Sequence, residues 1–130
     1  MTPRERLLTA FTNGRPDHVP AAPDLYEMVP VRLSGRPSWE MLLYQDPPVW
    51  KGRMDACAHF GVDAYIPLWV PMAPPDHTAV VFRSDEKVIA RDFSETESGE
   101  RRWSSIAVVY ARHEPSAYVK AETIGLPAEH

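Results

Sequence analysis

The sequence contains little of what marks secreted, membrane-spanning or nucleic-acid-binding proteins. Cys57 is its only cysteine, so an internal disulfide is impossible and a reducing compartment, the cytoplasm, is expected. No apolar run approaches the ~18 residues of a membrane span, and charged residues stand within the first six positions. Neither membrane insertion nor secretion is therefore expected.

Charge of one sign is equally sparse. The formal net charge is -4 at pH 7, and no block of like charge is longer than the Arg101-Arg102 pair. Nothing in this pattern would attract a phosphate backbone over a wide surface, so nucleic-acid binding is not expected. Trp103 beside the two arginines could suggest such a contact, but alternation along a β-strand explains it equally well.

What the chain does contain is an ordinary globular composition. Its 130 residues are 44% hydrophobic and 25% charged, which suffices for one domain with one core. The 14 prolines are about twice the usual share, but they are scattered from Pro3 to Pro127. We interpret them as helix starts, strand ends and loop corners.

The first residues predict a capped helix. Thr2 suits the N-cap, Pro3 suits the first helical position, and Glu5 stands where it closes a capping box. Asn13-Gly14 predicts the end of this helix. Its apolar face is expected to hold Leu7, Leu8 and Phe11.

A second helix is predicted from Asp46 as N-cap and Pro47 as first helical residue to a stop at Gly61. Apolar residues recur in it at spacings of three and four, and they are expected to form its buried face. They are Val49, Trp50, Met54, Cys57 and Ala58. Cys57 and His59 are poor metal ligands because positions two apart on a helix share no face, so a buried structural cysteine is preferred.

Short strands and helical pieces are expected around these helices. The strands are expected at residues 19–25 and 62–68, and the helical pieces at 26–33 and 38–43. The first strand is expected from its context, because Pro20 and Pro23 cannot donate to a ladder. Residues 1–77 are therefore interpreted as an α/β opening segment.

Beyond residue 77 the pattern becomes strand-like. Strands are expected at residues 78–83, 87–93, 102–110 and 118–124. Polar turns separate the first three of them. An antiparallel β-meander over 78–130 is therefore predicted, appended to the α/β opening within a single domain of 1–130.

Three sequence motifs occur in an informative order: Thr2–Leu8 with Asn13–Pro20, the helix end His59–Ala64, and the strands after Thr78. Together they resemble the N-terminal region of the uroporphyrinogen decarboxylase (URO-D) superfamily, which also holds corrinoid-linked methyltransferases. The resemblance implies the opening segment of a (β/α)8 TIM-type barrel, left incomplete because a full barrel takes about 250 residues. Its open edges imply pairing with a partner chain or a second copy, a homo-oligomer.

The resemblance favours the methyltransferase branch. In the decarboxylases the first strand is followed by arginines that bind the acidic tetrapyrrole, and the second strand ends in an essential aspartate. This sequence has no cation in residues 20–25 and no acid in 66–70. The resemblance therefore implies methyl transfer from a small methylated substrate to a corrinoid or thiol acceptor. Zinc and corrinoid belong to a complete relative, and no cofactor is expected on this segment.

Candidate site residues follow the two expected barrel strands, where such enzymes place their sites. Asp24 and Glu27 are candidate catalytic residues, as a general acid or a hydrogen-bond partner of substrate; alternatively they cap the next helix. Tyr26, Trp69 and Met72 are candidate substrate-binding residues. The proline-rich loop around the last two could form an apolar pocket wall, or it could cover the barrel rim or a dimer contact.

Three functions are open on the sequence alone. The chain is the N-terminal segment of a methyltransferase-like enzyme that is inactive alone and takes a small-molecule substrate once completed. Alternatively it is a non-catalytic interaction or structural subunit that assembles as a dimer or with a partner. The third reading, a uroporphyrinogen decarboxylase of heme biosynthesis, would require arginines that this segment lacks.

Overall fold

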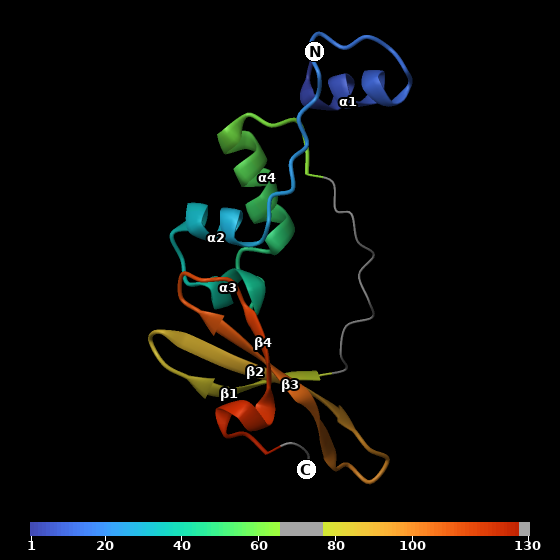
Figure 1. The fold of residues 1–130 in the computed structure, drawn as a ribbon. Helices are drawn as coiled ribbons and strands as arrows, with labels where there is room; N and C mark the ends of the chain where they lie inside the picture. The colour runs from blue at the N-terminus through green and yellow to red at the C-terminus, as the bar shows by residue number, and fades with distance from the viewer. Residues whose placement is uncertain (66–76, 128–130) are drawn as a thin grey trace. The chain divides into compact units, whose positions relative to one another are not determined.

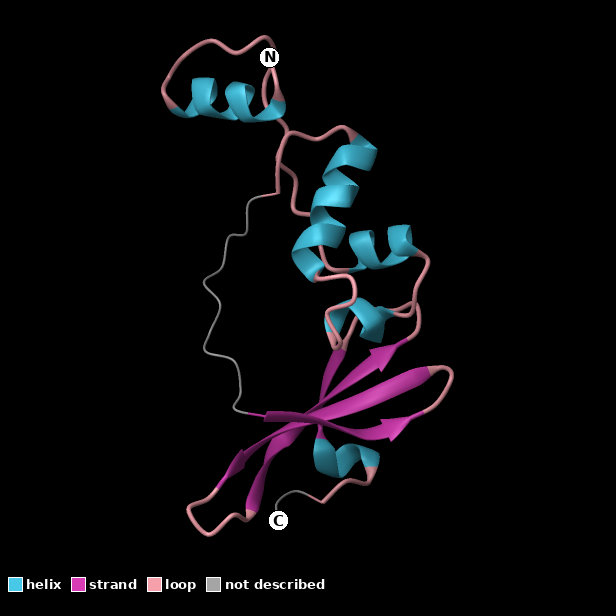
Figure 2. Ribbon diagram, turned by 180° about the vertical axis from the view of Figure 1, so that it is seen from behind, coloured by secondary structure: helices cyan, strands magenta, loops and turns pink. Residues whose placement is uncertain are grey.

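A computed structural model describes residues 1–65 and 77–127, and the chain divides into two compact units (Figure 1). Over the described residues, the first unit comprises Met1–Arg36 and 40–65, and the second comprises Pro37–Trp39 and 77–127. The helices are α1 (Pro3–Phe11), α2 (Met28–Ser34), α3 (Ser38–Leu42) and α4 (Val49–Phe60). The second unit is built on an antiparallel sheet, magenta in Figure 2.

Helix α1 begins as the sequence predicts. The Thr2 hydroxyl accepts the Glu5 backbone N–H at 3.3 Å, and the Glu5 carboxylate accepts the Thr2 backbone N–H at 2.8 Å. This confirms the capping box, which satisfies two donors that a helix start leaves unpaired. Pro3 occupies the first turn, where its missing N–H costs nothing.

Helix α4 ends as predicted but begins later. Gly61 closes it with φ +65°, a left-handed conformation that glycine adopts without strain. The predicted start is wrong: Pro48 is the N-cap and makes no side-chain cap, and Val49 is the first helical residue. The Asp46 backbone N–H donates to the Glu40 carbonyl at 2.8 Å, which holds Asp46 in the preceding turn and away from the helix start.

The core of the first unit forms where α2 packs against α4. Two clusters of buried side chains lie there, one of Leu25, Ala56 and Cys57 and one of Met28, Val31 and Met41. Val49 packs at the edge of the second cluster, and Cys57 belongs to the first, as predicted. Trp50, Met54 and Ala58 were expected on the same buried face, and they are exposed.

The expected barrel opening does not occur in the described residues. Residues 19–25 form no strand, and neither do 62–65, the described part of the second expected strand. The first segment contains two prolines that have no N–H for a ladder, and the Asp63 N–H donates to the Ala21 carbonyl at 2.8 Å in a loop contact. Without helix-to-strand repeats, the expectation of an α/β, TIM-type barrel segment is wrong.

The second unit contains the antiparallel meander. Its strands are β1 (His77–Arg83), β2 (Lys87–Glu95), β3 (Arg101–Ala111) and β4 (Ala117–Lys120), hydrogen-bonded in chain order. The last expected strand is too long, because residues Ala121–Ile124 form a 3-10 helix, η1, that packs against β3 and β4. The Thr123 hydroxyl donates to the Lys120 carbonyl at 2.6 Å, a local bond that competes with strand pairing.

Strand register places two different rows of side chains on the two faces of the sheet. Val80, Ala90, Val108 and Tyr118 pair in turn across all four strands, so they share one face. His77, Phe93 and Trp103 pair across β1, β2 and β3, and they lie on the other face. Ala107 and Val88 are fully buried, so the core of this unit lies along its two central strands.

Candidate functional site

Arg6 is the centre of a charge cluster in the first unit. Its Nε and Nη2 donate to the two carboxylate oxygens of Asp17 at 2.6 and 3.1 Å, and its Nη1 donates to Asp63. The second Asp63 oxygen accepts the Ala21 backbone N–H at 2.8 Å. Arg6 and the Asp63 side chain are almost completely buried. One guanidinium therefore joins α1, the turn after it and the segment after α4.

The electrostatics of this cluster keep its three groups charged. The hydrogen bond to Asp17 raises the pKa of Arg6, and the same bond lowers the pKa of Asp17. The pKa of Asp63 is lowered first by the Ala21 N–H and then by Arg6. Carboxylates that stay ionised at neutral pH are poor general acids. The cluster is thus suited to holding segments together and not to proton transfer.

The predicted site residues of the first unit lie in the stretch before α2. Asp24 and Tyr26 are exposed, whereas Leu25 between them is buried in the core. Glu27 stands at the N-cap position of α2 and makes no side-chain cap there. Tyr26 and Glu27 thus share the turn that starts α2. Trp69 and Met72 lie outside the described residues.

Cys57 behaves as a structural cysteine. It is buried in the core, and burial raises the pKa of its thiol. The exposed His59 ring packs edge-on against Phe60, with ring centroids 4.8 Å apart. Over residues 1–65 and 77–127, no three His, Cys, Asp or Glu side chains are grouped so that they could hold a metal ion.

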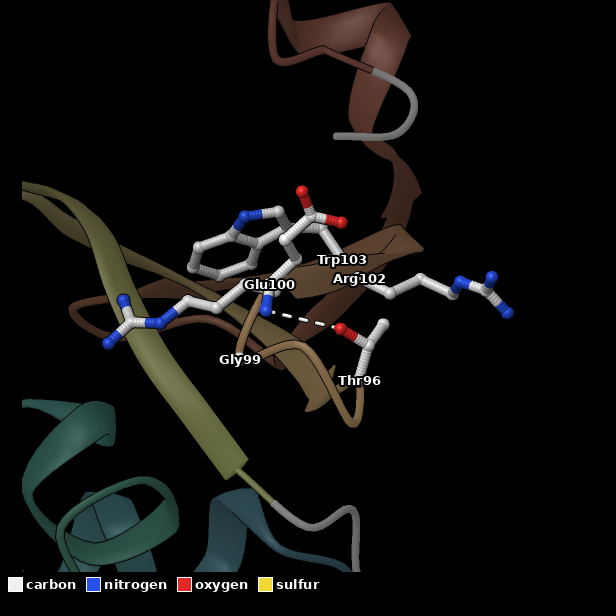
Figure 3. A pocket seen from close by; sticks show the side chains of 6 residues that line it. Thr96, Gly99, Glu100, Arg102 and Trp103 are labelled. Carbon is white, nitrogen blue, oxygen red and sulfur yellow. Dashed lines mark hydrogen bonds between the residues drawn. The ribbon is translucent and has the colours of Figure 1, made fainter.

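A pocket of about 680 Å³ lies at the tip of the hairpin that joins β2 and β3 (Figure 3). Its lining residues are Thr96, Gly99, Glu100, Arg101, Arg102 and Trp103. Figure 3 shows the Trp103 indole and the Arg102 side chain extending in opposite directions, as neighbours on a strand do. The pocket is largely open to solvent, and its volume falls within the range of small-molecule sites.

An aromatic row lies on the sheet face beside this pocket. The Phe93 ring packs on one side against His77 and on the other against Trp103, with centroids 5.0 Å apart in both pairs. The Arg101 guanidinium lies 4.6 Å from the Phe93 ring centre, and that of buried Arg91 lies 5.7 Å from the Trp103 ring. The sequence pattern at Arg101 to Trp103 indicated alternation along a strand. The signal for the aromatic pair lies in the antiparallel alignment of two expected strands, 87–93 and 102–110, in which Phe93 pairs with Trp103.

Comparisons with known proteins do not place the chain in a family. Neither models of protein families, nor curated proteins, nor solved structures give a match. The motif resemblance to the URO-D superfamily therefore stays a prediction. None of the helices in the described parts of the chain is both long and apolar enough to cross a membrane.

Proposed function

We propose that the chain is the N-terminal segment of an enzyme related to the URO-D superfamily, methyltransferase-like in its chemistry and inactive until further polypeptide covers it. The observation that carries this proposal is the exposed apolar surface on two helices of the first unit. That surface is a place where further protein chain would bind.

The exposed residues follow helical spacing. On α1, Leu8 and Phe11 are three residues apart and 49% and 68% exposed; on α4, Trp50 and Met54 are four apart and 67% and 46% exposed. Residues at these spacings form a stripe on one helix face. Full burial of a side chain of this kind contributes about 1.5–3 kcal/mol. A contiguous apolar surface is a feature of protein contact sites.

The Arg6 cluster supports the resemblance on which the proposal rests. Arg6 and Asp17 come from the opening motif and Asp63 from the helix-end motif, and Arg6 binds both aspartates. Arg6 and Asp63 are 57 positions apart in sequence and in direct contact. A shared structural role explains why both motifs contain a residue of this pair. In this chain they hold α1, and with it the exposed stripe, in a defined place.

Chemistry would come largely from outside this segment. The resemblance implies a zinc site that activates the methyl acceptor, with ligands later in a complete relative. What this chain offers are Asp24, Tyr26 and Glu27 at the start of α2, two of them exposed. They are the residues of this segment that we expect to contact a small methylated substrate.

Coexpression tests the proposal. The DNA that follows the codon for His130 is cloned with the chain, and the products are copurified. We expect an equimolar complex that transfers methyl groups from small methylated thiols or amines to reduced cobalamin, read as methylcobalamin absorbance. Trp50→Glu should abolish copurification. Lys51→Glu, an exposed neighbour about 100° around the helix, should not. Coexpression that yields no copurifying second polypeptide, or a complex indifferent to Trp50→Glu, would refute the proposal.

A second candidate, a non-catalytic subunit that assembles with its own copy, is favoured by the sheet. Tyr118 is 76% exposed, and Val80 and Ile106 on the same face are also exposed. A homodimer whose mass is reduced to that of the monomer by Tyr118→Lys, and that binds no second polypeptide, would favour this candidate over the first.

A further inference from the structure

We propose that the hairpin joining β2 and β3 binds a small organic anion that carries a flat ring, with Arg101 holding the anionic group and Trp103 contacting the ring. The inference rests on the second unit alone and is independent of the proposed function. Its evidence is the shape, the charge and the aromatic lining of the pocket in Figure 3.

The hairpin loop that shapes the pocket is held by its own hydrogen bonds. The Thr96 N–H donates to the Glu100 carbonyl at 2.9 Å, and the Gly99 N–H donates to the Thr96 carbonyl at 2.9 Å. The Glu100 N–H donates to the Thr96 hydroxyl at 3.1 Å, the dashed line in Figure 3. Gly99 adopts φ +81°, which a residue with a side chain would strain to reach. A loop fixed in this way loses little entropy when a ligand binds.

The charge of the pocket favours an anion. Two arginines and the Glu100 carboxylate line it, and Glu95 stands opposite Arg101 in the strand register without lining the pocket. Among the described residues, neither Arg101 nor Arg102 forms a salt bridge with Glu100 or with any other acid. Within residues 1–65 and 77–127, no acid therefore engages their N–H donors in a salt bridge. A guanidinium offers several in-plane N–H donors that match a carboxylate or a phosphate.

The aromatic row supplies the surface for a ring. Trp103 pairs with Phe93 across the strands, and Arg101 is two positions before Trp103, so all three lie on one face of the sheet. The Arg101 guanidinium at 4.6 Å from the Phe93 ring is held beside this surface. Arg91 contacts the Trp103 ring and donates from Nε to the Ser104 carbonyl, which supports the indole. Cation and ring surface therefore adjoin each other.

A small anion fits this site better than a nucleic acid. The chain carries a net charge of -4, and no block of like charge in it is longer than a pair such as Arg101-Arg102. A protein that binds along the phosphate backbone of a nucleic acid needs a wide basic surface. One pocket at a hairpin tip suits a ligand with a single anionic group and a single ring system.

Titration by nuclear magnetic resonance tests the inference with three probes. 1-Naphthyl phosphate has both ring and anion, 1-naphthol has only the ring, and inorganic phosphate has only the anion. We expect 1-naphthyl phosphate to shift the Gly99 and Glu100 amide signals and the Trp103 indole signal, with saturation. The other two probes should bind at least about fivefold more weakly. Equal binding of all three, or shifts elsewhere in the chain only, would overturn the inference.

Three variants locate the site. Arg101→Gln should weaken binding of 1-naphthyl phosphate at least about threefold, and Trp103→Leu should do so about fivefold or more. Lys120→Gln removes the same charge from an exposed position on β4 and should leave affinity unchanged. Retained dispersion of the amide spectrum verifies the fold of each variant. Equal effects of Arg101→Gln and Lys120→Gln would show that only net charge matters and would contradict the site.

Discussion

Arg6 and Asp63 are joined by a charge-assisted hydrogen bond from Nη1 to Oδ1 across 57 positions of sequence. The other oxygen of Asp63 is bound by the Ala21 N–H, so this carboxylate ties α1 and the segment before α2 to the end of α4. Its burial makes the pairing necessary, because a nearly buried carboxylate without partners is strongly unfavourable.

Removing the guanidinium should destabilise the first unit. Arg6→Met keeps much of the side-chain volume but leaves Asp63 nearly buried with only the Ala21 N–H as its partner. We expect the midpoint of thermal unfolding, followed by circular dichroism, to fall by several degrees. Arg4→Met on the same helix is exposed and should change the midpoint by less than about 2 °C. Equal shifts for the two variants would show that the cluster does not stabilise the fold.

The cluster also predicts a dependence on pH. The folded-state pKa values of Asp17 and Asp63 are lowered, so the stability they contribute is present above about pH 4 and is lost as the pH falls through the lowered values. The wild-type midpoint should therefore drop more between pH 7 and pH 3 than that of Arg6→Met, which lacks the cation. Parallel decreases in the two proteins would contradict the assignment.

Gly52 should resist enlargement. A Cβ at this position of α4 would lie 2.7 Å from the Met41 Cε and 3.2 Å from the Pro30 Cβ, and Met41 is itself fully buried. We expect Gly52→Val to lower the free energy of unfolding, measured with urea, by about 1–3 kcal/mol. Ala58→Val on the exposed side of the same helix should cost no more than about 0.7 kcal/mol. A neutral Gly52→Val would mean that α2 and α4 pack less tightly than the structure shows.

Local signals in the sequence predicted local structure well. The capping box of Thr2 and the stop at Gly61 depend only on nearby backbone groups, and both are confirmed. The positions of β1, β2 and β3, which are joined by turns, also agree closely with the expected strands. Each of these features is determined within a few residues, where the sequence pattern is most reliable.

Long-range structure could not be predicted in the same way. Helical spacing marked Trp50 and Met54 as core, but which apolar stripe is buried depends on the partner that packs there, and α2 covers the other side. Arg6 gave no sign that it would be buried with two aspartates from distant segments. The hairpin pocket likewise depends on the pairing of Phe93 with Trp103, which becomes visible only when two strands are aligned.

The apolar stripes of α1 and α4 are proposed to be contact surfaces. The mass of the purified chain in solution tests this most directly. Light scattering across a range of concentrations should show association above the 14.7 kDa of the single chain. The double variant Trp50→Glu, Met54→Glu should lower the measured mass toward that of the monomer. Association through the stripe would remove the two new carboxylates from water, which is unfavourable. A wild-type chain that is folded and has a mass of 14.7 kDa at every concentration would contradict the account.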